Sequence, residues 1–204
     1  MDSRRPNVSG LIAAARGAEA GALDRLLGAF RNYLKLLAQT SLRAALRSKA
    51  DPSDIAQETM LRAAQHFEQF RGATEAELAG WLRQILARYM ANLARHYQVV
   101  GARRVDRERS LEHLLAASSA ALGQLVAGSE GSPSRAAQRH EMSVILADAL
   151  AELSDDYREV IVLHNLEELD WPEVARRMNR TPSAARMLWA RALKQLRPLL
   201  EERT

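Results

Sequence analysis

The chain has 204 residues, of which 47% are apolar and only 5% aromatic. Leu, Ala and Arg are prominent; strong helix formers therefore dominate, and the expected fold class is all-α. The absence of cysteine excludes disulfides, thiolate zinc sites and a cysteine nucleophile. The formal net charge of +4 is compatible with a nucleic-acid partner but is equally common in other proteins.

Long apolar stretches are missing from the sequence. A membrane-spanning helix needs roughly 20 mostly apolar residues, and the best candidate, 111–127, is shorter and carries Glu112 and His113. No signal-peptide pattern is visible near the start of the chain. We therefore expect a cytoplasmic protein with no membrane partner.

The first half of the chain is predicted to form helices over residues 11–15, 23–48, 51–71 and 75–97. Apolar residues recur at three-to-four spacing in the long segments, as on one face of an amphipathic helix. Asp51 is a good N-cap and Pro52 suits the first helical position, so the third helix begins there. Trp81 adjoins Leu82 and Ile85 and is assigned to the core rather than to a wedge that melts DNA.

The apolar periodicity weakens between residues 98 and 135. Gly101, an Arg-rich run and the segment 128–134 (GSEGSPS) are typical of a linker, within which 111–125 is a candidate helix. The predicted organisation is a first domain over 1–98, a flexible linker over 99–135 and a second domain over 136–204.

Two helices joined by a tight turn are predicted near the C-terminus. Asp170 is expected to cap the first, over 171–179, and Thr181 the second, which extends to about Leu196. Asn179 tolerates the left-handed backbone conformation that the turn needs. This pattern is the helix-turn-helix, whose second helix reads the major groove of DNA.

The second of these helices suits DNA chemically. Its N-terminus offers unpaired amides and the positive end of the helix dipole to a phosphate. Cations further along the helix suit contacts with the DNA backbone. The predicted DNA-binding residues are Arg180, Thr181, Ser183, Arg186, Arg191 and Lys194.

Charges are segregated along the sequence. Residues 51–79 and 141–170 are acidic, whereas 80–110 and 171–198 are basic. A plain solvated surface usually mixes its signs. The repeated acidic-then-basic order therefore indicates two different partner surfaces on each half.

Four further motifs occur in a fixed order: 51–63 (DPSDIAQETMLRA), 67–72 (FEQFRG), 80–88 (GWLRQILAR) and 153–160 (LSDDYREV). With the helix-turn-helix, this set resembles extracytoplasmic-function (ECF) sigma factors of bacterial RNA polymerase, from about residue 9 to residue 200. The resemblance implies a region 2 bundle that docks on the polymerase and opens the −10 promoter element. It also implies a region 4 helix-turn-helix that reads the −35 element and docks on the polymerase flap.

The resemblance further implies where the polymerase is bound. Asp54, Gln57, Glu58 and Leu61 fall on the motif with which family members bind the clamp helices of the largest core subunit. The alternative is a solvated acidic helix face. An acidic face with an apolar centre fits a basic protein partner, which favours docking.

The loop over 72–78 corresponds to the family's loop that captures an extruded −10 base. Polar and cationic residues on the next helix suit single-stranded DNA. The −10 residues so implied are Arg71, Gly72, Gln84, Arg88, Asn92 and Arg95. Many members carry Asn where Arg88 or Tyr89 stands, and a common Thr-Val-Lys-Ser-Arg run is replaced by 184–188 (AARML). The promoter sequence therefore cannot be borrowed from relatives.

No catalytic, metal or cofactor site is expected. The five histidines are scattered, and Val144 replaces the second histidine of a zinc-protease motif that His140 would begin. The expected partners are core RNA polymerase and promoter DNA, without a small-molecule substrate; an anti-sigma factor is typical of the family. Two alternatives stay open: a stand-alone helix-turn-helix regulator, and a helical adaptor that does not bind DNA.

Overall fold

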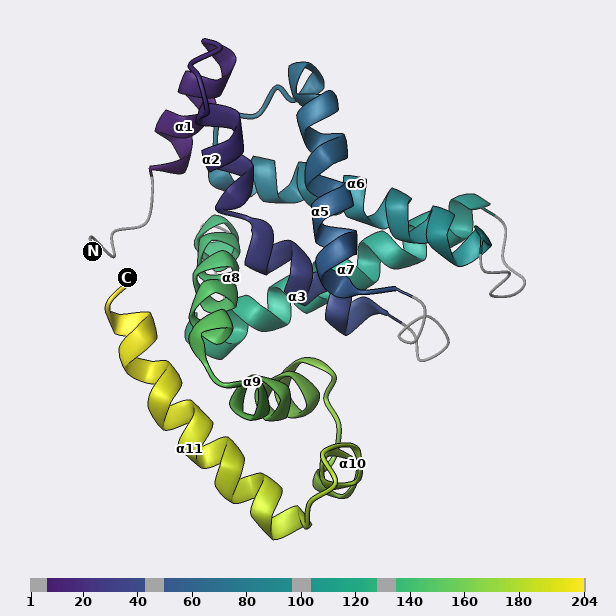
Figure 1. Ribbon diagram of the computed structural model, residues 1–204, viewed down its shortest axis with the longest axis vertical. Coiled ribbons are helices and arrows are strands. Elements are labelled where there is room, and N and C mark those ends of the chain that lie inside the picture. The colour runs from purple at the N-terminus through teal and green to yellow at the C-terminus, as the bar shows by residue number, and fades with distance from the viewer. Residues whose placement is uncertain (1–6, 43–49, 97–103, 128–134, 204) are drawn as a thin grey trace.

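The computed structural model describes residues 7–42, 50–96, 104–127 and 135–203. Every regular element in these ranges is a helix, which confirms the all-α fold class (Figure 1). No helix in the same ranges is both long and apolar enough to cross a membrane.

The N-terminal half is a bundle of helices packed around fully buried aromatic and aliphatic side chains. Its helices are α1 (Val8–Arg16), α2 (Ala22–Gly28), α3 (Arg31–Ser41), α5 (Pro52–Gln65) and α6 (Glu75–His96). Phe30 and Tyr33 are fully buried and meet edge to face, with ring centroids 6.4 Å apart. Such pairs add to the free energy gained from burial alone.

The single helix expected over 23–48 is wrong. The chain leaves helical geometry at Phe30 (φ −105°, ψ 1°), which separates α2 from α3. The Phe30 amide donates to the carbonyl of Leu27 at 3.0 Å, a tight turn that turns the Phe30 ring into the core. Burial of this large ring outweighs the continuous periodicity of the sequence. Residues 43–48 of the expected helix lie outside the described residues.

The helix that begins at Asp51 also ends earlier than predicted. The Asp51 carboxylate accepts from the Ser53 amide at 2.6 Å, as expected of an N-cap, but α5 stops at Gln65. A 3₁₀ turn (Phe67–Gln69) follows. It brings Phe67 and Phe70 against half-buried Trp81, with Phe70 and Trp81 centroids 5.3 Å apart. Trp81 therefore packs in the core, as assigned.

Helix α7 (Arg104–Ala127) occupies most of the segment predicted as a linker. It crosses the middle of the molecule and packs against α3, α6 and α8 (Figure 1). Leu115 and Leu122 are fully buried there. The Tyr33 hydroxyl donates to Ser119 Oγ at 2.9 Å and accepts from Arg83 Nη1 at 2.9 Å. A buried polar contact thus joins α3, α6 and α7.

The C-terminal half contains α8 (Arg135–Glu152), α9 (Asp155–Ile161), a π-helical turn (Val162–Leu166), α10 (Trp171–Arg177) and α11 (Pro182–Glu201). Helix α11 runs past the predicted end at Leu196 and lies alongside α8 and α9 (Figure 1). Arg158 caps α8, because its guanidinium donates to the carbonyls of Leu150 at 2.9 Å and Leu153 at 2.8 Å.

Candidate functional site

A groove between α2, the start of α3 and α5 collects the predicted polymerase-binding residues. Its volume is about 520 Å³, and Asp54, Gln57, Glu58 and Leu61 all line it. Leu61 is 52% exposed, an unusual amount for a large apolar side chain in this molecule. The Glu58 carboxylate accepts from Arg62 Nε at 2.8 Å. The groove therefore combines an exposed apolar centre with carboxylates, of which Glu58 is already paired.

The loop over 70–77, which contains Arg71 and Gly72, is tightly fixed. A Cβ at Gly72 would lie 2.6 Å from Glu77 Cβ and 2.7 Å from the Phe70 ring, so only glycine fits without movement. The Glu77 carboxylate accepts from the amides of Ala73 at 2.8 Å and Thr74 at 2.9 Å, and from the Thr74 hydroxyl at 2.8 Å. These hydrogen bonds, led by the one from Ala73, hold the pKa of Glu77 below its ordinary value.

The predicted −10 residues of α6 are exposed and lie three or four residues apart, on one helix face: Gln84, Arg88, Asn92 and Arg95. The Asn92 side-chain oxygen accepts a hydrogen bond from Arg95. Arg83 differs from this set, because it reaches the hydroxyl of buried Tyr33. Helix α6 thus presents a polar, cationic strip that follows the 70–77 loop in the chain.

The helix-turn-helix forms as the sequence predicts. Asp170 accepts from the Glu173 amide at 3.0 Å, and the Thr181 hydroxyl accepts from the Ala184 amide at 3.2 Å. Asn179 has φ 53°, in the left-handed region. The Arg180 amide then donates to the Ala175 carbonyl at 2.8 Å, which closes the turn. Local hydrogen bonds therefore fix where α10 begins, how the turn closes and where α11 begins.

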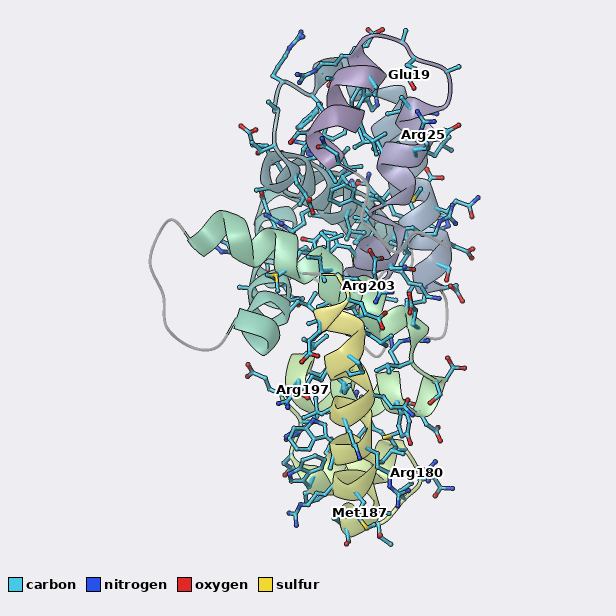
Figure 2. The ribbon with its side chains drawn as sticks, turned by 90° about the vertical axis from the view of Figure 1, so that its left-hand side faces the viewer. Glu19, Arg25, Arg180, Met187, Arg197 and Arg203 are labelled. Atoms are coloured by element: carbon cyan, nitrogen blue, oxygen red, sulfur yellow. The ribbon has the colours of Figure 1, made fainter. Side chains whose placement is uncertain are left out.

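The first turns of α11 form an exposed end of the molecule. Ser183, Arg186 and Met187 are exposed there, and Met187 lies at the tip, opposite the end that carries Glu19 and Arg25 (Figure 2). The Arg186 guanidinium lies 5.8 Å from the Trp171 ring centroid. Trp171 stacks on His164 with centroids 3.9 Å apart. An aromatic platform therefore supports Arg186.

The other predicted cations of this half differ in how they are held. Arg191 and Lys194 are exposed further along α11. Arg180 Nη2 lies 2.6 Å from the Asp156 carboxylate. A phosphate would have to compete with Asp156 for Arg180, so this residue is less available than the other two.

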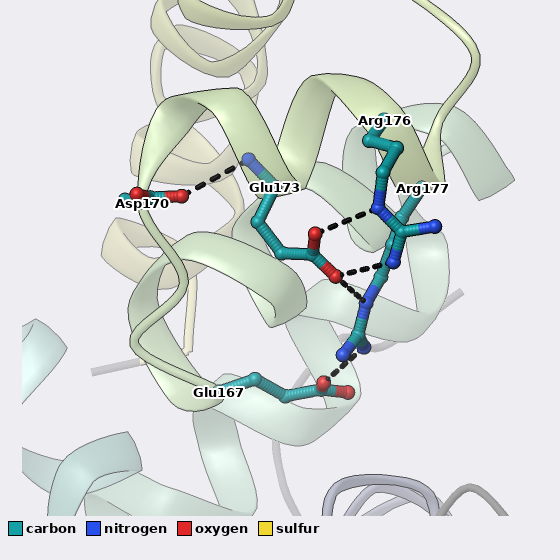
Figure 3. A network of polar contacts seen from close by, with 5 residues as sticks. All are labelled: Glu167, Asp170, Glu173, Arg176 and Arg177. Atoms are coloured by element: carbon teal, nitrogen blue, oxygen red, sulfur yellow. Dashed lines mark hydrogen bonds and ion pairs between the residues drawn. The ribbon is translucent and has the colours of Figure 1, made fainter.

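Two further arginines near the turn are held by carboxylates (Figure 3). Glu173 accepts from Arg176 at 2.7 and 2.8 Å and from Arg177 at 3.1 Å, and Arg177 also pairs with Glu167 at 2.6 Å. The bonds from Arg176 and then Arg177 lower the pKa of Glu173 to about 2. This network fixes α10 to the preceding turn. Among the described residues no ion pair of Arg191 or Lys194 is found, so α11 supplies the more available cations.

Two family models match the chain: sigma-70 region 2 over residues 29–99, and sigma-70, region 4 over residues 143–196. Together they cover more than half of its length, with region 2 before region 4. The chain belongs to the sigma-70 family. It is similar to the ECF RNA polymerase sigma factor SigM of Bacillus subtilis (strain 168), at 26% identity over 158 residues, which are 78% of this chain and 85% of SigM.

A solved structure described as the RsbN-BldN complex also aligns with this sigma factor. The alignment covers 92% of this chain and 98% of that chain, at 19% identity and a TM-score of 0.32. Sigma factors are non-enzymatic transcription initiation factors. Because the chain matches both sigma-70 regions and the ECF sigma factor SigM, it is an ECF sigma factor that binds core RNA polymerase and directs initiation at particular promoters. The family disfavours both alternatives, the stand-alone regulator and the adaptor without a DNA role.

The candidate binding residues fall within the two sigma-70 matches. The groove residues of α5, the 70–77 loop and α6 fall in the region 2 match, and the helix-turn-helix falls in the region 4 match. Helices α1 and α7 lie outside both matches. Any role of these two helices in the sigma factor must therefore be argued from their contacts.

Sequence reasoning missed several residues of these surfaces. Met187, to which no role was assigned, is 56% exposed near the start of α11. The Thr74–Glu77 pair has the Thr-x-x-Glu spacing of a capping box, a signal that was available in the sequence. Arg16 contacts the 70–77 loop from 54 and 56 residues away, and no local pattern could have revealed it.

Proposed function

We propose that this sigma factor works through three separate surfaces. The clamp surface, which binds the clamp helices of the largest polymerase subunit, is Asp54, Gln57, Glu58 and Leu61. The −10 surface, which holds the melted strand, is Arg71, Gly72, Gln84, Arg88, Asn92 and Arg95. The −35 surface, which reads duplex DNA, is Arg180, Thr181, Ser183, Arg186, Arg191 and Lys194.

The clamp surface carries the proposal. All four of its residues line one groove of about 520 Å³, although they were chosen from a sequence motif alone. An exposed leucine surrounded by polar side chains has the anatomy of an interface hot spot, in which an apolar anchor fills a pocket of the partner. Asp54 and Glu58 suit a basic partner helix and would speed association.

The −10 surface combines a rigid loop with a cationic strip. Extruding a base from the duplex costs a few kcal/mol, which binding must offset. The loop amides are already hydrogen-bonded to Glu77, so the loop loses little further conformational entropy when it binds a base. Arg88 and Arg95 then supply charge along the single strand.

The −35 surface has distinct parts. Arg186, supported by Trp171, can reach a guanine edge with its forked guanidinium, and Met187 beside it suits the methyl group of a thymine. Arg191 and Lys194 contact phosphates and set the salt dependence of binding. Arg180 contributes less, because it first has to leave Asp156.

The proposed organisation has two units and a connecting segment. The first unit, 1–98, and the second, 136–204, are joined through 99–135, and the second also docks on the polymerase flap. The protein works in the cytoplasm, where the polymerase carries out the chemistry. An anti-sigma factor is a further proposed partner, and the resemblance to ECF sigma factors is its support.

Co-migration with purified bacterial core polymerase tests the clamp surface. Leu61→Ala removes the exposed apolar centre and should weaken core binding about 30-fold, the loss expected for an interface anchor. Leu114→Ala is the matched control, because Leu114 is 44% exposed on α7, away from the groove. Equal binding by both variants would contradict the assignment of the clamp surface.

A further inference from the structure

The last residue of helix α1 contacts the 70–77 loop. This residue, Arg16, donates from Nη2 to the carbonyl oxygens of Gly72 at 2.6 Å and Phe70 at 3.2 Å. The same guanidinium carbon lies 5.6 Å from the centroid of the Phe70 ring. One side chain thus makes three contacts with a loop that is more than fifty residues away in sequence.

The opposite side of the loop is fixed independently. Glu77 binds the amides of Ala73 and Thr74, and Phe70 packs on Trp81. The loop backbone therefore has its amides held from the α6 side and its carbonyls held from the α1 side. Removing Arg16 would free the carbonyl side while the other side stayed in place.

We propose that Arg16 is a positioning residue for promoter opening, through which α1 keeps the 70–77 loop ready to receive the extruded −10 base. This inference rests on the proposed function of the −10 surface. The region 2 match begins at residue 29, so α1 lies before the matched part.

The contacts explain why an arginine is needed. Its planar guanidinium donates to both carbonyls from Nη2, which carries two N–H bonds in fixed directions, while the plane of the group lies over the Phe70 ring. A lysine carries the same charge as a compact ammonium on a flexible stem and makes these contacts less well. Charge alone therefore does not replace Arg16.

The test measures how holoenzyme, assembled from core polymerase and this protein, binds a fluorescent single strand of the −10 element found by run-off transcription. Arg16→Ala should weaken strand binding about tenfold, because the carbonyl side of the loop must be ordered on binding. Arg16→Lys should recover only a small part of that loss. Affinity for core polymerase and for duplex −35 DNA should stay at the wild-type values.

Arg25→Ala is the matched control. Arg25 is also an exposed arginine of the N-terminal segment, but it pairs with Glu19 at 2.7 Å, and the two lie together at one end of the molecule (Figure 2). It should bind the −10 strand like the wild type. Full recovery by Arg16→Lys would overturn the positioning role, because charge would then suffice.

Three other outcomes also overturn the inference and can be told apart. If Arg71→Ala weakens strand binding while Arg16→Ala does not, α1 has no positioning role and the −10 surface stands. If neither variant changes strand binding, the proposed function of the loop fails, and the inference fails with it. An equal loss of core, −35 and −10 binding by Arg16→Ala would indicate a general loss of fold and contradict a positioning role.

Discussion

The −10 and −35 surfaces of this sigma factor are held in place by different kinds of contact. The 70–77 loop depends on Arg16, which is more than fifty residues away. The turn of the helix-turn-helix depends instead on bonds between near neighbours, from the Arg180 amide to the Ala175 carbonyl and from the Ala184 amide to the Thr181 hydroxyl. The first surface is therefore positioned by tertiary structure and the second mainly by local sequence. Substitutions that remove distant contacts should disturb the first surface and spare the second.

The largest effect is expected at Gly72 within the loop. Gly72→Ala would place a methyl group 2.6 Å from Glu77 Cβ and 2.7 Å from the Phe70 ring, and we expect it to lower the free energy of unfolding by about 2 kcal/mol. Gly28→Ala is the control, because no atom lies within 4 Å of the added Cβ and alanine favours helix. Chemical denaturation measures both, and equal stability would show that the loop is loosely packed.

The next effect concerns the contact that joins α3, α6 and α7. Tyr33→Phe removes the hydroxyl that donates to Ser119 and accepts from Arg83, and should cost about 1–2 kcal/mol of unfolding free energy. The matched control is Tyr157→Phe, since no hydrogen bond of the Tyr157 hydroxyl is found among the described residues. Thermal unfolding measures both variants. Equal unfolding temperatures would contradict a stabilising role of the Tyr33 hydroxyl.

The sequence predicts features that depend on local contacts better than features that depend on distant ones. Asp170, Asn179 and Thr181 were all predicted in their capping and turn roles, because each acts on backbone groups within a few residues. The break at Phe30 was missed, because burial in a core assembled from distant helices decides it. The division into domains stays a proposal.

The candidate site shows the same limit. The groove residues were named from a motif, but that they line one groove with α2 depends on tertiary packing. Arg16 had no local signal at all, since its partners are carbonyls of a remote loop. Sequence patterns therefore identified the surfaces better than they identified what supports them.

A smaller, local effect is expected at the recognition helix. Thr181→Ala removes the hydroxyl that accepts from the Ala184 amide and should cost about 1 kcal/mol. Ser154→Ala is the control, because Ser154 precedes α9 without a side-chain capping bond. Hydrogen exchange of the first amides of α11 should be faster in Thr181→Ala than in Ser154→Ala. Equal exchange rates in the two variants would mean that the Thr181 hydroxyl does not stabilise the start of α11.

The smallest effect concerns the pH dependence of the Glu173 network. Its pKa is lowered from about 4.5 to about 2, so its contribution to stability is present above pH 4.5 and is lost as the pH falls toward 2. Between pH 5 and pH 3 the wild type should lose more stability than Glu173→Gln. Since Arg176, the main partner of Glu173, is 72% exposed, added salt should reduce the difference. Parallel pH curves for the two proteins would contradict this assignment.

The central claim is that this sigma factor selects promoters through its −35 surface once its clamp surface has bound the polymerase. Run-off transcription from genomic fragments with purified core polymerase tests it most directly, comparing no added protein, the wild type, Arg186→Ala and Arg197→Ala. We predict discrete new start sites with the wild type, fewer or weaker ones with Arg186→Ala, and start sites kept with Arg197→Ala, which loses a charge elsewhere on α11. Start sites that do not depend on the protein, or that are unchanged by Arg186→Ala, would contradict the account.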